Sequence, residues 1–139
     1  KHGEAKCIVM CSGKIYYDLA NARDAAEAWD IEILRVEQLY PFPSKTTFEL
    51  LSKTPSAEVI WCQEEPKNMG GWTFVRDFIE DAMQAASMKQ SRLKYAGRPA
   101  AASPATGSFA RHVKEQKQLV AEALGPMLAA SPKADLTKK

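Results

Sequence analysis

The feature that most constrains this chain is its alternation of short apolar runs with longer amphipathic stretches. Apolar runs occupy residues 5–11, 31–36 and 58–63, and each has the length of a buried strand. After each run, apolar residues recur every three or four positions, which is typical of a helix that packs on one face. This alternation predicts an α/β fold, a three-layer α/β/α arrangement in which helices cover both faces of a mainly parallel sheet.

The spacing also predicts where helices and a weaker fourth strand lie. The helices are expected over residues 14–29, 45–53, 72–87 and 108–124, and the fourth strand over residues 92–95. Trp29 and Phe109 fall on helix faces that we expect to be buried, and Ser44 is a candidate N-cap of the second helix. Gly125-Pro126 is expected to end the last helix.

A chain of 139 residues suits one domain, and we expect it to occupy residues 1–125. Residues 126–139 have little periodicity and contain three lysines against one aspartate, so we expect a loose C-terminal tail. The first residue is not methionine and a strand follows almost at once, which suggests a fragment of a longer protein.

The balance of charge argues against two classes of partner. The chain has 19 basic and 17 acidic residues, a formal net charge of +2. This balance does not favour nucleic acid or an anionic membrane surface. No apolar run approaches the roughly 20 residues that span a bilayer, and no signal peptide is visible. We therefore expect neither a nucleic-acid partner nor a membrane partner.

The three cysteines, Cys7, Cys11 and Cys62, are expected to be reduced, because an odd number of thiols in a domain of this size is typical of intracellular proteins. Four residues of strand separate Cys7 from Cys11 by roughly 13 Å, beyond disulfide reach. Small buried apolar side chains are the favoured interpretation. A metal site is not expected, since there is no Cys-x-x-Cys and the two histidines, His2 and His112, are far apart.

Ligands of open parallel sheets bind beyond the carboxyl ends of the strands. The first strand is followed by a turn at Ser12, Gly13 and Lys14. Its free N–H groups and the lysine make a weak candidate anion site. The turn lacks the glycine pattern of a dinucleotide site or a P-loop, and one glycine is enough to make a turn. We favour the structural interpretation here.

The third strand is followed by Glu64 and Glu65, the acidic pair that most suggests a catalytic site. Two carboxylates can act as general acid and base, but adjacent residues on an extended chain point to opposite faces. Asn68 in the same loop and Arg98 in a later Pro- and Ser-rich loop are candidates for contact with another domain or subunit. We favour contact over catalysis, while a small hydrolase or isomerase that uses Glu64 and Glu65 remains an alternative.

Four segments together resemble one known family. They are CSGKIYYDL at 11–19, RVEQLYPFP at 35–43, WCQEEPKNMG at 61–70, and YAGRP with SPATG between 95 and 107. In this order they resemble the C-terminal domain of the 2-oxoglutarate dehydrogenase E1 component, bacterial type. The resemblance covers residues 6–124.

The resemblance implies a fold and a parent enzyme. The fold is transketolase C-terminal-like, with the parallel strands in the order 2-1-3-4 and an antiparallel edge strand that is missing from this fragment. The parent is an oxidoreductase and a homodimer in the bacterial cytoplasm. It decarboxylates 2-oxoglutarate on thiamin diphosphate and Mg, and passes the succinyl group to lipoyl groups of the E2 succinyltransferase in the citric acid cycle.

The resemblance also implies that the catalytic and cofactor sites lie outside this chain. Enzymes of this class hold magnesium and the diphosphate after a Gly-Asp-Gly turn, and this chain has none. We expect no catalytic, cofactor-binding or metal residue here, and we expect the isolated fragment to be inactive. Glu64, Glu65, Asn68 and Arg98 are expected to contact upstream E1 domains or the homodimer partner. The alternative is a regulatory α/β domain that binds a nucleotide or acetyl-CoA through residues 12–14 and Arg98.

Overall fold

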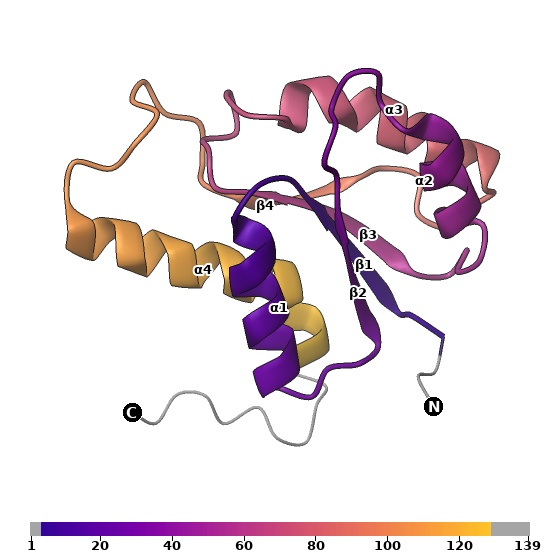
Figure 1. Cartoon of the computed structure of the whole chain (residues 1–139), viewed down its shortest axis with the longest axis horizontal. Helices are drawn as coiled ribbons and strands as arrows, with labels where there is room; N and C mark the ends of the chain where they lie inside the picture. Colours follow the sequence, from indigo (N-terminus) through magenta and orange to yellow (C-terminus); the bar gives the residue numbers. More distant parts are fainter. Residues whose placement is uncertain (1–3, 129–139) are drawn as a thin grey trace.

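The computed structural model describes residues 4–128, in which strands and helices alternate along the chain (Figure 1). The strands are β1 (Cys7–Cys11), β2 (Ile31–Arg35), β3 (Glu58–Gln63) and β4 (Lys94–Gly97). The helices are α1 (Ile15–Ala25), α2 (Ser44–Leu51), α3 (Trp72–Ala85) and α4 (Phe109–Leu128). All three strand pairings are parallel and the sheet order is β2-β1-β3-β4. The expected α/β fold and strand order are confirmed.

The strand β1 lies in the middle of the sheet, and all five of its residues are buried. Its last residue, Cys11, is in register with Arg35 on β2 and Cys62 on β3. Because successive side chains on a strand point to opposite faces, a strand covered on both faces must be apolar throughout. The sequence CIVMC meets that requirement.

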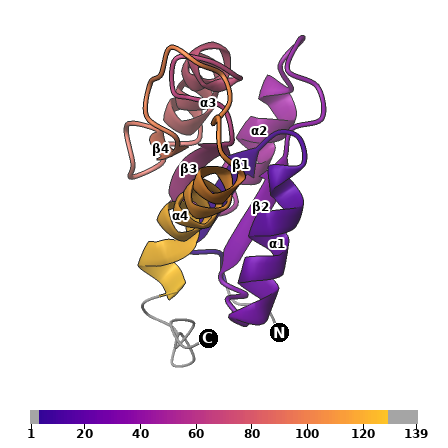
Figure 2. The same ribbon diagram turned by 90° about the vertical axis from the view of Figure 1, so that its left-hand side faces the viewer.

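Two helices cover each face of the sheet, with α1 and α4 on one face and α2 and α3 on the other (Figures 1 and 2). On the first face, Leu19 and Leu119 pack with Val9 of β1 in one apolar cluster. On the second face, Trp61 and Ile79 belong to a separate cluster. The strands therefore separate two cores, each closed by its own pair of helices.

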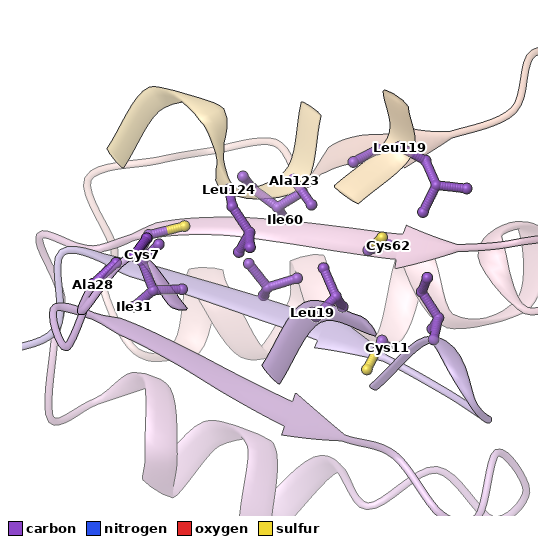
Figure 3. Close-up of a cluster of buried hydrophobic side chains, with 14 residues drawn as sticks. Cys7, Cys11, Leu19, Ala28, Ile31, Ile60, Cys62, Leu119, Ala123 and Leu124 are labelled. Atoms are coloured by element: carbon purple, nitrogen blue, oxygen red, sulfur yellow. The ribbon is translucent and has the colours of Figure 1, made fainter. Parts of the chain in front are cut away.

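The three cysteines lie in the first core, between the sheet and helices α1 and α4 (Figure 3). Each is a free thiol and at most 1% exposed. Burial raises the pKa of the Cys7 and Cys11 thiols to about 12 and raises the pKa of Cys62 as well. Their expected role as small buried apolar side chains is confirmed.

Two predictions of buried aromatic residues are wrong. The first helix ends at Ala25, and Glu27 then adopts a positive φ of 53°. Trp29 therefore lies beyond the helix, 48% exposed, with the Arg23 guanidinium 5.7 Å from its ring centroid. Phe109 is the first residue of α4 and is 83% exposed, because the helix begins beyond the edge of the sheet.

The predicted end of the last helix is also wrong, because α4 continues through Gly125 and Pro126 to Leu128. Gly125 does not have the positive φ of a helix-ending glycine. Leu119, Ala123 and Leu124 are buried against the sheet, so packing holds the helix up to this point. The expected loose tail begins as helix, and its residues 129–139 lie outside the described residues.

Smaller differences concern the ends of two elements. Ser44 is the first helical residue of α2, and the N-cap is Pro43, which makes no side-chain cap hydrogen bond. The hydroxyl of Thr47 instead donates to the carbonyl of Pro43 (2.9 Å). The fourth strand lies at Lys94–Gly97, two residues later than predicted, and pairs with the second half of β3.

Candidate functional site

The carboxyl ends of the strands open onto a groove of about 430 Å³. The 12–14 turn after β1, the 64–71 loop after β3 and the 98–108 loop after β4 lie at this end of the sheet (Figure 1). The lining includes most of the polar groups singled out from the sequence, namely Lys14, Glu64, Glu65, Arg98 and His112, together with Glu115 and Gln116 of α4. The parallel topology therefore brings residues as distant in sequence as Lys14 and Gln116 into one site.

Glu64 is the centre of a polar network on one side of this groove. One of its carboxylate oxygens, Oε1, accepts hydrogen bonds from Lys14 Nζ (2.5 Å) and from Gln116 Nε2 (2.9 Å). The same Gln116 nitrogen donates to Asp18 Oδ2 (2.7 Å) on α1. The hydrogen bond to Glu64 raises the pKa of Lys14, so the lysine stays protonated. Lys14, the proposed counter-charge of an anion site, is thus already paired with a carboxylate.

Gln63 holds the 64–71 loop from beneath. Its side chain is 2% exposed, and Oε1 accepts hydrogen bonds from Trp61 Nε1 and from the backbone N–H of Trp72, both at 2.9 Å. Its Nε2 donates to three backbone carbonyls of the loop, those of Glu65 (3.2 Å), Pro66 (3.1 Å) and Met69 (2.8 Å). One buried amide thus contacts five polar groups, of which the carbonyls of Pro66 and Glu65 also accept from the Met69 N–H and the Tyr95 hydroxyl.

The far side of the 64–71 loop is fixed to the segment that follows β4. The side chain of Asn68 donates to the carbonyl of Ala101 and accepts from its N–H, both at 3.0 Å. The backbone N–H of Lys67 donates to the carbonyl of Arg98 (3.1 Å). The Lys67 ammonium also lies 5.3 Å from the ring centroid of Tyr95, in cation–π geometry.

A close backbone approach joins the two strands beneath these loops. A Cβ at Gly97 would lie 2.7 Å from the carbonyl oxygen of Gln63 and equally close to the Tyr95 hydroxyl. That hydroxyl donates to the Arg98 carbonyl (2.8 Å), and burial raises the pKa of Tyr95 to about 12. Only glycine fits at position 97 without moving one of the two strands.

Arg98 is paired within the chain. Its Nε lies 2.8 Å from Glu115 Oε2, and its Nη1 donates to the carbonyl of Pro104 (3.0 Å). Arg111 bonds the other oxygen of the same carboxylate at 2.8 Å. The hydrogen bond from Arg111 and the charge of Arg98 lower the pKa of Glu115.

A family model described as 2-oxoglutarate dehydrogenase C-terminal matches residues 1–124. The chain belongs to this family. Curated relatives include proteins named 2-oxoglutarate dehydrogenase E1 component from Brucella anthropi, Brucella ovis and Brucella canis. Each is 47% identical over 125 residues, which are 90% of this chain and 12% of the relative. The family predicted from four sequence segments is confirmed, and the chain spans about an eighth of the length of these relatives.

The structure of this 2-oxoglutarate dehydrogenase C-terminal domain brings some of the predicted site residues into contact and keeps others apart. Lys14 and Glu64, 50 positions apart, are in direct contact. Ser12 and Gly13 make the turn, where Gly13 has a φ of 79°. Glu64 and Glu65 diverge, since Glu65 is exposed and lies beside Gly70 rather than Lys14. Both carboxylates line the groove, but only Glu64 is bonded to Lys14.

Sequence reasoning missed three polar residues on which this arrangement depends, Gln63, Glu115 and Gln116. Gln63 had a visible signal, because a glutamine that ends a buried strand must find partners. Glu115 and Gln116 had none, because polar residues on an amphipathic helix are most often solvated. Only the packing of α4 beside β3 and β4 shows their role.

In the described part of the chain, no helix is long and apolar enough to cross a bilayer.

Proposed function

We propose that this chain is the C-terminal assembly domain of a thiamin-diphosphate-dependent 2-oxoglutarate dehydrogenase E1. The parent enzyme oxidatively decarboxylates 2-oxoglutarate and transfers the succinyl group to lipoyl groups of the E2 component of the citric acid cycle. The family match and the names of the Brucella relatives support this proposal. Because these relatives are bacterial, the proposed location of the parent is the bacterial cytoplasm.

We propose that the domain itself is non-catalytic, and the observation that supports this is the pairing of Glu64 and Glu115, two of the three carboxylates that line the groove. Glu64 is bonded to an ammonium group and an amide, and Glu115 is bonded to two guanidinium groups. A general base must be free to accept a proton from its substrate. Both carboxylates instead serve to hold α4 and the strand-end loops together.

We propose that the groove does not hold magnesium and thiamin diphosphate. Magnesium takes several oxygen ligands in octahedral geometry. Among residues 4–128, no cluster of three or more His, Cys, Asp or Glu side chains has the geometry of a metal site. The cations Lys14 and Arg98, whose charges suit a diphosphate, are paired with Glu64 and Glu115. We infer that the upstream E1 domains and their dimer partner hold the cofactor.

The proposed role of the carboxyl edge is contact with those upstream domains and with the homodimer partner. Asn68, Arg98 and Glu64 set the shape of the edge through their bonds within the chain. Glu65 is exposed, and its carboxylate is the group offered to a neighbouring surface. We propose that these four residues support the interface, three by positioning and one by direct contact.

The regulatory alternative, a site for a nucleotide or acetyl-CoA, has a specific observation in its favour. Lys14, Arg98 and His112 all line the same groove. For a phosphate to bind, Lys14 or Arg98 would have to leave its carboxylate partner. A rise in the melting temperature of the chain with millimolar AMP or acetyl-CoA would support this alternative, since a ligand of the folded state stabilises it.

The decisive experiment compares the isolated chain with a full-length E1. With 2-oxoglutarate, thiamin diphosphate and magnesium, the chain should release no carbon dioxide, and calorimetric titration should detect no binding of thiamin diphosphate. Turnover by the chain alone would refute the assembly role. In full-length E1, Glu65→Lys should weaken dimerisation in sedimentation experiments. Glu122→Lys, on the exposed side of α4, is the matched control.

A further inference from the structure

Four exposed aromatic side chains gather on the α2–α3 side of the molecule, and we call them the aromatic patch. They are Tyr40, Phe48, Phe74 and Phe78, with exposed fractions between 37% and 80%. Tyr40 lies in the loop between β2 and α2, Phe48 lies on α2, and the other two lie on α3. Scattered exposed apolar residues are ordinary, but a contiguous group marks an interaction surface.

Ring contacts join three members of the patch, Tyr40, Phe74 and Phe78, and Phe48 lines a groove together with Phe78. The ring centroid of Tyr40 lies 6.4 Å from that of Phe74, and Phe74 lies 5.2 Å from Phe78. Phe78 in turn stacks on the buried Phe42 at 5.3 Å, with 19° between the ring planes. Phe42 belongs to the core beneath α2 and α3. The patch is therefore supported by the core rather than free to collapse onto it.

A groove of about 320 Å³ continues the patch between α2 and α3. Phe48 and Phe78 line it, together with the small side chains of Ala82 and Ala85. Lys45 and Asp81 also border the groove and contribute one charge of each sign. An apolar, electrically balanced groove of this kind accepts aliphatic or aromatic side chains of a polypeptide rather than a charged ligand.

The patch adjoins the carboxyl edge to which the proposed function assigns contact. Leu39, next to Tyr40, would lie 3.6 Å from a Cβ at Gly71 of the 64–71 loop. The relatives extend far beyond the 125 aligned residues, which are 12% of their length. If the chain is the C-terminal part of such an E1, most of its polypeptide lies upstream and is available to cover this surface.

We propose that the aromatic patch and its groove dock an apolar segment of the E1 polypeptide that lies upstream of residue 1. This inference rests on the proposed function and extends it to a second surface. The segment presents aliphatic or aromatic side chains, with Phe48 and Phe78 on either side of the inserted group. Aromatic residues in such positions carry much of the binding energy of protein interfaces.

The first test is hydroxyl-radical footprinting of the isolated chain and of a full-length E1 that contains it. The side chains of Tyr40 and Phe74 should be oxidised several-fold more slowly in the full-length protein. Equal rates in the two proteins would overturn the proposal. Protection that grows with the concentration of the isolated chain would assign the patch to a second copy, and would overturn it as well.

A matched pair of variants separates docking from folding. Phe74 is the third residue of α3 and Tyr17 is the third residue of α1, on the opposite face of the sheet. A glutamate is tolerated near a helix N-terminus, so both substitutions to Glu should leave the melting temperature of the isolated chain close to its original value. In full-length E1, Phe74→Glu should speed proteolytic release of the domain several-fold, whereas Tyr17→Glu should not.

These outcomes distinguish the inference from the function on which it rests. Equal release rates for the two variants, together with unprotected aromatic residues, would remove the docking surface and leave the assembly role of the carboxyl edge intact. Turnover by the isolated chain would instead remove the proposed function. The footprinting uses unmodified protein, so it remains decisive if Phe74→Glu disturbs folding.

Discussion

The 12–14 turn and the 64–71 loop leave adjacent strands at the same edge of the sheet, yet the fold holds them differently. The turn is made by one glycine with open space around it, since a Cβ at Gly13 would meet nothing within 4 Å. The loop is fixed by a buried amide, and a Cβ at Gly70 would lie 3.0 Å from Glu65 and 3.1 Å from Gln63. The turn thus reverses the chain, whereas the shape of the loop is fixed by specific contacts of its side chains and backbone, which suits the proposed contact with a neighbouring surface.

The largest effect is expected from Gln63→Leu, which removes all five hydrogen bonds of the buried amide. Each buried polar group left without a partner costs about 1–3 kcal/mol, so the free energy of unfolding should fall by roughly 3 kcal/mol or more. Urea unfolding of the chain at 25 °C measures this. Gln118→Leu, at an exposed position of α4, is the control and should change it by less than about 0.5 kcal/mol. A loss below about 1 kcal/mol for Gln63→Leu would show that the loop does not depend on this amide.

Gly70→Ala should have the next largest effect. Gly70 has a φ of 65°, and its missing Cβ leaves room for Glu65 and Gln63. The left-handed conformation costs an alanine about 1 kcal/mol, and crowding should bring the total to roughly 2–3 kcal/mol. The same urea unfolding measures it. A cost no greater than that of Gly13→Ala would contradict the proposed difference between loop and turn.

Gly13→Ala should cost about 1 kcal/mol, because only the left-handed conformation opposes the methyl group. Gly13 has a φ of 79° and no neighbour that the methyl group would touch. Measured beside Gly70→Ala, this variant isolates the cost of crowding in the loop. A loss well above about 2 kcal/mol would mean that the turn is as tightly specified as the loop.

The smallest effect concerns Glu115, whose bonds to Arg98 and Arg111 support the segment bound to the loop. Its pKa is lowered from an ordinary value of 4.5, so the folded state favours the carboxylate. The resulting stability is present above that value and is lost as the pH falls through the lower pKa of the folded state. Glu115→Gln should therefore reduce the melting temperature at neutral pH and have less effect in acid, at a pH of about 3. An equal effect at both pH values would contradict the assigned charge interaction.

The strands of the sheet could be predicted because each buried strand is a run of consecutive apolar residues. The buried run at β1 and the one at β3 can be read from consecutive apolar residues, and short crossovers with helices leave few parallel topologies. The strand order came from the family resemblance. The errors are at element ends, where Trp29, Phe109 and Pro126 depend on how far each helix extends past the sheet. Periodicity does not contain that information.

The candidate site was predicted only as a set of loops. The sequence placed Lys14 and Glu64 at the carboxyl edge, since strand ends can be located from the apolar runs, and it placed Arg98 only in a later Pro- and Ser-rich loop. It could not show that Lys14 meets Glu64 or that Arg98 meets Glu115, because those pairings depend on where α4 crosses the sheet. Polar contacts between distant segments follow from packing rather than from local pattern.

The amide of Gln63 carries no charge, so its hydrogen bonds differ from the ion pairs of this edge in how they depend on pH and salt. Neither a proton nor dissolved salt competes for the amide's bonds as they do for an ion pair. We therefore expect the hydrogen bonds of Gln63 to hold the 64–71 loop equally well over a wide range of pH and salt concentration. Salt can instead weaken the ion pairs at this edge, those of Lys14 with Glu64 and of Arg98 with Glu115.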